Sequence, residues 1–268
     1  DKLVTGVQTC ALPILGTAVE DVIAERFAPD AAALERYERL LVRRAAHEPV
    51  AYILNRREFW SLGFSVGPGV LIPRPETEIL IEEALKAFPR KDAELDVLDL
   101  GTGSGCLLLA FLSERPNAQG LGIDRSHEAL AWAVHNARRL GLADRTQFLH
   151  ADWTDAPAQS FDVVFSNPPY IETKTIATLA PDVAAYEPLG ALDGGVDGLD
   201  AYRTLASLLP RLLRPEGRAF IEIGLGQDEL VTGIFSAVDL HVVQIVPDLA
   251  GIPRCVCVAS SAREQQVK

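Results

Sequence analysis

Methionine is absent from this 268-residue sequence, and cysteine and histidine are scarce. The four cysteines and five histidines form no C-x-x-C pair and no cluster with metal-ligand spacing, so the sequence predicts no zinc and no other metal site. Cys255 and Cys257 lie two apart in a strand-like stretch and would share one face of a sheet. We expect them to be buried thiols of a cytoplasmic protein, where disulfides are rare, rather than a redox pair.

Long apolar runs are also missing. No stretch of 18 apolar residues and no secretory signal pattern occurs, so the sequence predicts neither a membrane span nor export. Basic residues are outnumbered, with 25 Lys and Arg against 37 Asp and Glu and a net charge of −12. Strong non-specific binding to nucleic acid depends on basic side chains that neutralise phosphates, so this composition argues against it, although a local basic patch is left open.

The first residues need separate treatment. Residues 4–14, VTGVQTCALPI, resemble the in-frame translation of a sequencing-library adapter. Together with the missing methionine, this indicates that residues 1–14 are an artefact of an incomplete gene and do not belong to the fold. The alternative is a genuine apolar N-terminal segment, in which case Cys10 would belong to the protein.

Hydrophobic spacing next predicts two helices, at residues 19–27 and 31–47. Pro29-Asp30 is a plausible start signal for the second helix. We interpret residues 15–48 as the remnant of a helical N-terminal domain whose beginning is missing.

Residues 49–75 differ from the helices on either side, and we name them the hairpin linker. Strand-like residues 58–60 and 64–66 flank a turn at residues 61–63, which is the pattern of a β-hairpin. A helix from residue 76 to about residue 88 then opens the domain that we assign to residues 76–268.

Strand and helix patterns alternate in this last domain. Apolar runs predict strands at residues 95–100, 120–124, 146–150, 161–166, 218–223, 241–246 and 254–259. Helical spacing predicts helices at residues 105–112, 126–140, 199–213 and 227–237. The alternation predicts an α/β, Rossmann-like fold with a doubly wound, seven-stranded, mostly parallel sheet whose last strand is antiparallel.

A glycine-rich turn joins the first of these strands to its helix. It consists of Gly101, Thr102, Gly103, Ser104 and Gly105. Glycines let the backbone approach a ligand closely, and the start of a helix presents free N–H groups. Asp124 ends the next strand, where its carboxylate could accept hydrogen bonds from both hydroxyls of a ribose. The pair predicts a nucleoside-cofactor site; the alternative is a tight turn without a ligand.

The spacing of the glycines bears on the choice of cofactor. A dinucleotide site typically has G-x-G-x-x-G, whereas this turn has G-x-G-x-G. Asp99, two residues before the turn, adds a carboxylate that a cationic amino-acid tail could meet. This favours S-adenosylmethionine, which carries an ammonium and a sulfonium group, over NAD.

Asp152 and Trp153 follow the third strand. In this fold the position lies beside the bound nucleoside, so Trp153 could stack on adenine and Asp152 could approach its amine. An equally good interpretation is a surface tryptophan that fills a groove.

The fourth strand ends in Asn167, Pro168, Pro169 and Tyr170. Proline has no N–H to donate to a strand ladder, so the strand stops there and a rigid loop follows. Ligands bind at the carboxyl ends of parallel strands, and fixed carbonyl oxygens beside a flat ring suit a planar nitrogen group. Taken alone, the tetrapeptide also fits a proline-stiffened turn with no ligand.

These motifs together resemble a class I S-adenosylmethionine-dependent methyltransferase acting on a planar nitrogen. Further stretches resemble the peptide chain release factor N5-glutamine methyltransferases. They are EPVAYI at 48–53 with REF at 57–59, LIPRPETE at 71–78, YEP at 186–188 with residues 191–199, and GIPR at 251–254. The resemblance covers about residues 17–260.

The resemblance implies a function and a set of site residues. Methyl transfer would go to the glutamine of the Gly-Gly-Gln motif of a class I release factor. The cofactor would contact Gly101 to Gly105, Asp124, Trp153 and Asn167, and the glutamine would be held by Asn167, Pro168, Pro169 and Tyr170. The family has a helical N-terminal domain that helps to bind this partner, and here we expect it to be truncated.

Two other functions are compatible with the motifs. One is an N-methyltransferase on DNA adenine or RNA guanine, which would have to take a base out of its stack and would usually carry a basic target-recognition region. The other is a cofactor-binding interaction protein without activity, for which the intact Asn-Pro-Pro-Tyr would have no use. We expect a monomeric enzyme that acts on a release factor and not directly on DNA.

Overall fold

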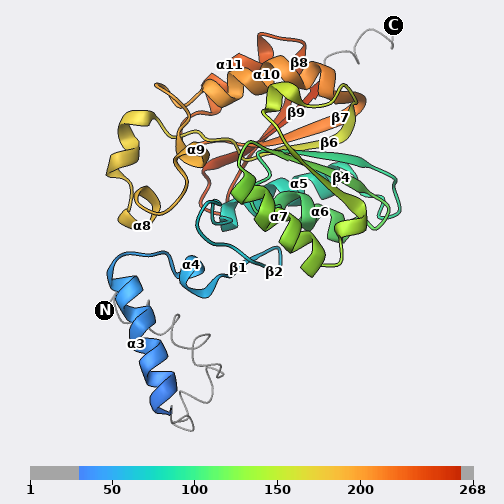
Figure 1. Cartoon of the computed structure of the whole chain (residues 1–268). Coiled ribbons are helices and arrows are strands. Elements are labelled where there is room, and N and C mark those ends of the chain that lie inside the picture. The colour runs from blue at the N-terminus through green and yellow to red at the C-terminus, as the bar shows by residue number, and fades with distance from the viewer. Residues whose placement is uncertain (1–29, 261–268) are drawn as a thin grey trace, which may run out of the picture.

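The computed structural model describes residues 30–260. The expected helix at residues 19–27, the segment 1–14 that we interpret as an artefact, and Cys10 within it lie outside this range. Within it, a central sheet is covered by helices on both faces, and the chain enters through a helix that lies apart from the sheet (Figure 1).

The sheet has seven strands in the order β5-β4-β3-β6-β7-β9-β8. They are β3 (Asp96–Leu100), β4 (Gln119–Asp124), β5 (Thr146–His150), β6 (Phe161–Ser166), β7 (Leu213–Glu222), β8 (Leu240–Pro247) and β9 (Pro253–Ser260). Strands β3 to β7 are parallel to one another, whereas β9 is antiparallel to both β7 and β8. The predicted fold class, with its antiparallel last strand, is confirmed.

Strand order reverses between β3 and β6. The chain runs outward from β3 through β4 to β5 and then returns to place β6 on the other side of β3. Ligands of open α/β sheets bind at such a switch point, outside the carboxyl ends of the strands. The glycine-rich turn follows β3 and Asn167 follows β6, so the fold brings these two motifs to the same place.

Alternate side chains of each strand enter different cores, as the pleat of a strand requires. Val97 packs with the helices on one face, while Leu98 and Leu100 pack with those on the other. The first face is covered by α5 (Glu78–Ala87), α6 (Cys106–Glu114) and α7 (His127–Arg139), and the second by α10 (Asp200–Leu212) and α11 (Asp228–Ser236) (Figure 1). Cys255 and Cys257 lie together in the first core, as expected for buried thiols.

The described part of the N-terminal region contains α3 (Ala31–Ala45), and α4 (Val50–Leu54) follows at the start of the hairpin linker, where no helix was predicted. Asp30 caps α3 by accepting a hydrogen bond from the Ala33 N–H at 2.7 Å, so the predicted start signal is confirmed. The helix ends two residues before the predicted residue 47, and His47 has a left-handed backbone with φ of 65°.

The predicted hairpin exists, but its turn is shifted. The strands are β1 (Arg57–Phe59) and β2 (Leu62–Phe64), and the turn is formed by Trp60 and Ser61 rather than by residues 61–63. Both turn residues have positive φ, 52° and 56°. Two-residue hairpins favour this geometry because its twist matches that of the strands, and here it occurs without the usual glycine or asparagine.

Apolar residues of the hairpin linker are buried in the same core as α5, α6 and α7. Phe59, Phe64, Val66 and Val70 have no more than 1% of their surface exposed. Asn136 of α7 reinforces this packing, because its amide bonds to both Ser65 backbone groups and to the Ser104 carbonyl oxygen. The hairpin linker therefore forms one wall of the region that carries the glycine-rich turn.

Several short helices were not predicted. They are η2 (Ala143–Arg145), η3 (Trp153–Asp155), η4 (Thr173–Thr178), α8 (Pro181–Ala184) and α9 (Leu189–Leu192), whereas the predicted helix at residues 76–88 begins with the short η1 (Pro75–Thr77) and continues as α5. Such short helices do not display a hydrophobic period in sequence. Across residues 30–260, no helix is long and apolar enough to cross a membrane.

Candidate active site

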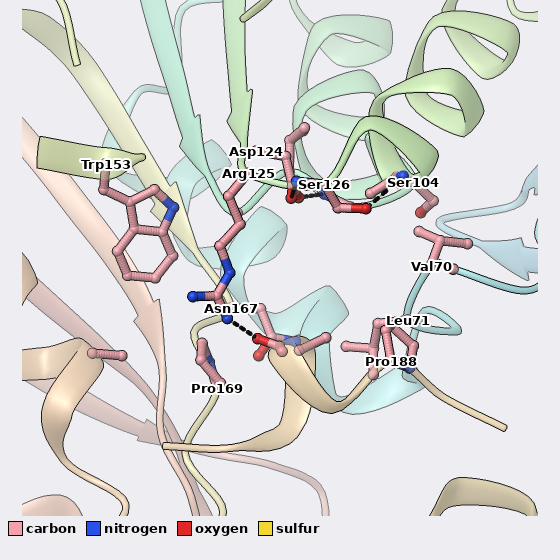
Figure 2. A pocket seen from close by; sticks show the side chains of 18 of the residues that line it. Val70, Leu71, Ser104, Asp124, Arg125, Ser126, Trp153, Asn167, Pro169 and Pro188 are labelled. Atoms are coloured by element: carbon pink, nitrogen blue, oxygen red, sulfur yellow. Dashed lines mark hydrogen bonds between the residues drawn. The ribbon is translucent and has the colours of Figure 1, made fainter. Parts of the chain in front are cut away.

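A cleft of about 1110 Å³ opens at the carboxyl edge of the sheet, beside the switch point (Figure 2). Most of the predicted site residues line it, namely Gly101, Thr102, Gly103, Ser104, Asp124, Trp153, Asn167 and Pro169. Gly105, Pro168 and Tyr170 are not among the residues that line it. The cleft therefore joins the two motifs that the sequence placed 62 residues apart, from Gly105 to Asn167.

The glycine-rich turn has the backbone that only glycine adopts readily. Gly101, Gly103 and Gly105 have φ of 79°, 55° and 80°. A Cβ on Gly101 would lie 3.1 Å from the Trp153 ring, and one on Gly105 would lie 3.1 Å from the Leu109 side chain. The glycines thus permit both the turn and its close packing against the cleft wall and α6.

Asp124 holds this turn in place. One carboxylate oxygen accepts the Gly103 N–H at 2.9 Å, and the other accepts the Ser126 N–H at 2.9 Å, at the start of α7. Each carboxylate oxygen can accept a second hydrogen bond. Asp124 can therefore serve the turn and still accept from the hydroxyls of a ribose in the cleft.

Asp99 lies beneath the turn and is 1% exposed. Its Oδ2 accepts the Thr102 hydroxyl at 2.7 Å, whereas its Oδ1 is buried without a hydrogen-bond partner within residues 30–260. Burial, together with the nearby Asp124 charge, raises the pKa of Asp99 to about 7. An incompletely bonded buried carboxylate is well suited to a cationic ligand.

Trp153 begins the short helix η3, which is capped by the preceding Asp152. The Asp152 carboxylate accepts both the Thr154 N–H and the Thr154 hydroxyl, at 3.0 and 2.9 Å. These hydrogen bonds fix the backbone so that the Trp153 ring stands at the cleft wall next to Gly101 (Figure 2).

Three further residues that line the cleft were not predicted. Arg125 extends into the cleft toward Asn167 (Figure 2), and its guanidinium donates to the Gly190 carbonyl oxygen of α9 at 2.9 Å. His127 and His150 stack with ring centroids 3.7 Å apart. A signal for Arg125 and His127 existed in sequence, because they closely follow the predicted acidic residue Asp124.

The end of β6 is tied to the end of β3. The Ser166 hydroxyl donates to the Leu100 carbonyl oxygen at 2.8 Å, so the glycine-rich turn and the Asn167 loop start from a common anchor. Asn167 then turns its amide toward η1, where Nδ2 donates to the Thr77 hydroxyl oxygen at 3.3 Å.

Glu222, at the end of β7, lies under this loop and is 2% exposed. It accepts hydrogen bonds from the hydroxyls of Thr77 and Tyr170, the latter at 3.1 Å. Burial raises the pKa of Glu222, and these two hydrogen bonds oppose that rise. Sequence reasoning missed Glu222, although a carboxylate at the carboxyl end of a predicted strand is a recognisable signal.

Tyr170 is held from several directions. Besides the bond to Glu222, its carbonyl oxygen accepts from the Gln227 amide at 3.0 Å. A Cβ on Gly198 would lie 2.5 Å from that oxygen, and one on Gly194 would lie 2.8 Å from the Tyr170 Cα. Gly194 and Gly198 are thus required for close packing against the Asn-Pro-Pro-Tyr loop.

Glu187 joins the rim of the cleft to the hairpin linker. Its carboxylate accepts the Ile72 N–H at 3.2 Å and the Arg74 guanidinium at 2.5 Å. The Glu187 side chain is 1% exposed and that of Arg74 is 33% exposed. These contacts give Glu187 a structural role.

The residues present fit S-adenosylmethionine. The buried Oδ1 of Asp99 lacks a partner that an ammonium group could supply, and Asp124 keeps acceptor capacity for a ribose. Trp153 offers a flat apolar surface for adenine, and the glycine backbone allows close approach. No group of three His, Cys, Asp or Glu side chains in residues 30–260 is arranged to hold a metal ion.

Comparison with known proteins gives the same assignment. The family model described as "Methyltransferase domain" matches residues 91–234, and the one described as "PrmC N-terminal domain" matches residues 15–54. The release factor glutamine methyltransferase of Caulobacter vibrioides is 49% identical over 239 residues, which cover 89% of this chain and 81% of the relative. That of Cereibacter sphaeroides is 46% identical over 228 residues, covering 85% and 80%.

A solved structure agrees in fold. The ribosomal protein L11 methylase of Lactobacillus delbrueckii subsp. bulgaricus is 18% identical, covers 73% of this chain and 83% of its own, and superposes with a TM-score of 0.53. Fold and cleft thus define a class I methyltransferase whose methyl donor is S-adenosylmethionine. Within that class, the chain belongs to the release factor glutamine methyltransferase family.

Proposed function

We propose that this protein transfers a methyl group from S-adenosylmethionine to the side-chain amide N5 of the glutamine in the Gly-Gly-Gln motif of a class I peptide chain release factor. The observation that carries the proposal is that Asn167 and the glycine-rich turn line one cleft at the switch point. Family membership at 49% identity supports the choice of substrate. We further propose a monomeric, cytoplasmic enzyme that does not act directly on DNA.

The site has to overcome the low reactivity of an amide nitrogen, whose lone pair is delocalised into the carbonyl group. When bound, S-adenosylmethionine supplies a methyl group on a positively charged sulfur, and the amide nitrogen takes this methyl group as the sulfur leaves. In our proposal the Asn167 side-chain oxygen and the Pro168 carbonyl oxygen each accept one amide N–H. This fixes the NH₂ group and aims its lone pair, and such placement can contribute on the order of several kcal/mol to the barrier reduction.

Pro169 and Tyr170 are the other two residues that bind the substrate amide in this proposal. Pro169 lines the cleft, while the Tyr170 side chain is anchored beneath the loop by Glu222. No charged base belongs to the loop, so the proton of the methylated nitrogen leaves to water. A neutral asparagine at position 167 suits a neutral amide substrate, since a carboxylate there would add a charge.

The test is a radiolabelled methyl-transfer assay with release factor, DNA and RNA side by side, followed by mapping of the labelled residue. We expect label on the release factor, at the glutamine of its Gly-Gly-Gln motif. Label on DNA adenine or RNA guanine instead would establish a nucleic-acid methyltransferase. Cofactor binding without transfer to any of the three would indicate an interaction protein.

Asn167→Ala is the matching test of the site. Because it removes one of the two proposed acceptors and leaves the glycine-rich turn intact, we expect methyl transfer to be lost while much of the S-adenosylmethionine binding remains. Transfer is measured with the release factor and binding by calorimetry. Near-normal transfer by this variant would contradict the proposed role of Asn167.

We also propose the division into residues 15–48, 49–75 and 76–268, with the helical part helping to bind the release factor. The match of residues 15–54 to a separate family model supports the first of these units.

A further inference from the structure

The Asn167 amide has two ends of similar shape and opposite chemistry. Its oxygen accepts hydrogen bonds, and its NH₂ group donates them. A glutamine substrate presents its amide N–H donors to Asn167, so the Asn167 oxygen must face the substrate. A flipped Asn167 would set donor against donor, and the substrate amide would lose one of its two acceptors.

A chain of hydrogen bonds runs from Asn167 into the protein interior. Asn167 Nδ2 donates to the Thr77 hydroxyl oxygen at 3.3 Å, and the Thr77 hydroxyl in turn donates to Glu222. Thr77 and Glu222 are each 2% exposed, so water cannot substitute freely for these partners. Thr77 precedes Asn167 by 90 residues and Glu222 by 145, which joins three distant parts of the chain.

The direction of this chain follows from its last member. The two hydroxyls that meet Glu222 donate to different oxygens of its carboxylate, that of Thr77 to Oε2 and that of Tyr170 to Oε1. A threonine hydroxyl has one proton, and here that proton is committed to Glu222. The Thr77 oxygen can then only accept from Asn167, and the end of the Asn167 amide that can donate is NH₂.

We propose that Thr77 and Glu222 are positioning residues that set the orientation of the Asn167 amide, with its oxygen toward the substrate. This positioning role rests on the proposed function, because Asn167 is one of the residues proposed to bind the substrate amide. Both residues act through Asn167. The same orientation contributes to selectivity for glutamine, since a glutamate carboxylate would bring oxygen against the Asn167 oxygen.

Thr77→Val removes the hydroxyl and keeps the shape of the side chain. We expect the single-turnover rate of methyl transfer to the release factor to fall about 10- to 100-fold, the effect of a misplaced reactive group. The dissociation constant for S-adenosylmethionine is expected to change less than about twofold, within the small effects seen where no contact is lost. Thr77→Ser, which keeps a hydroxyl, recovers most of the lost rate.

Thr232→Val is the matched control. The Thr232 hydroxyl is also buried but has no hydrogen-bond partner within residues 30–260, and it lies on α11 away from the cleft. Its removal is expected to leave the transfer rate at the wild-type value. Thermal unfolding of all variants identifies any loss that arises from misfolding.

A double-mutant cycle separates positioning from a general structural effect. The cycle compares the small residual single-turnover rate of Asn167→Ala with that of the double variant, and if Thr77 acts through Asn167, Thr77→Val lowers this residual rate no further. An equal fold-loss in both backgrounds, or a wild-type rate for Thr77→Val alone, would overturn the proposal.

The NMR signal of the Asn167 side chain tests the proposal without relying on methyl-transfer activity. In protein labelled with ¹⁵N-asparagine, the Asn167 side-chain NH₂ signal is the one lost in Asn167→Ala. We expect it to shift in Thr77→Val and to stay close to its wild-type position in Thr77→Ser. An unmoved signal in Thr77→Val would refute the hydrogen bond itself. If wild-type protein methylates no release factor, the proposed function fails, and this readout still decides whether Thr77 holds Asn167.

Discussion

Asp99 combines burial with an incomplete set of hydrogen bonds, and this links cofactor binding to pH. One carboxylate oxygen has no partner within residues 30–260, and the pKa of the group is raised to about 7. A cationic cofactor binds best to the ionised form. In our proposal the cationic cofactor pairs with this carboxylate, so that protons and cofactor compete for the same side chain.

We expect the affinity for S-adenosylmethionine to fall as the pH drops below about 7, approaching tenfold per pH unit in the limit of binding to the ionised form alone. The Asp99→Asn variant has no charge to titrate at this position, so it should bind more weakly and with a flatter pH profile. Calorimetric titrations between pH 5.5 and 8.5 (about three pH units around the pKa) measure this. An equally steep profile in Asp99→Asn would show that another group is responsible.

The raised pKa of Asp99 also affects the stability of the cofactor-free protein, and here the dependence on pH is the opposite of that for cofactor affinity. A carboxyl whose pKa is raised on folding holds its proton more tightly in the folded state. Its contribution to stability is full below its unfolded pKa and is lost as the pH rises through about 7. Asp99→Asn is therefore expected to raise the unfolding temperature of the cofactor-free protein more at pH 8 than at pH 5.

At the scale of elements, the Asn-Pro-Pro-Tyr loop depends on the segment between α9 and α10. Gly198 has φ of 74°, and a Cβ there would lie 2.5 Å from the Tyr170 carbonyl oxygen. Because that oxygen is backbone and also accepts from Gln227, it cannot move without displacing the loop. Glycine is needed at this position for both reasons.

Gly226 provides a matched control for Gly198. Its φ is 75°, but a Cβ there would meet nothing within 4 Å. Gly226→Ala is expected to lower the free energy of unfolding by the left-handed strain alone, about 1–2 kcal/mol. Gly198→Ala is expected to lower it by clearly more. We also expect Gly198→Ala to lower methyl transfer more than Gly226→Ala does. Urea unfolding and the transfer assay check this, and equal effects of the two variants would rule out the steric explanation.

Long elements and short ones differed in how well the sequence predicted them. Helices α7 and α10 span 13 residues each and were predicted to within one residue at either end, because two or more turns display a clear apolar period. The short helices between residues 173 and 192 display none. The hairpin turn at Trp60 and Ser61 was misplaced because neither residue is typical of its left-handed backbone.

At the scale of the whole molecule, Glu187 connects the hairpin linker to the cleft rim. Removing it by Glu187→Ala leaves the Ile72 N–H without its acceptor and Arg74 without its partner. We expect a loss of about 1–3 kcal/mol in the free energy of unfolding, the penalty for an unsatisfied buried group. Asp92→Ala removes an ion pair with Arg90 in which both side chains are about three-quarters exposed, 75% and 73%. It is expected to change stability much less, because solvent screens such pairs. Similar unfolding midpoints in urea for the two variants would contradict this account.

The sequence by itself determined the alternation of strands and helices, the glycine-rich turn, Asp124 and the rigid loop at Asn167. Each of these is a local pattern, set by apolar spacing or by the backbone limits of glycine and proline. Most of the residues predicted for the site do line the cleft, including Trp153, for which a plain surface role was an equal alternative.

Only the tertiary structure decided which distant side chains meet at the site. The return of β6 to the side of β3 places Asn167 opposite the glycine-rich turn. Thr77 and Glu222 reach Asn167 and Tyr170 across as many as 145 residues of sequence. A hydrogen bond depends on the distance between two atoms, and for residues so far apart that distance is set by the packing of the whole sheet rather than by any pattern in the neighbouring sequence.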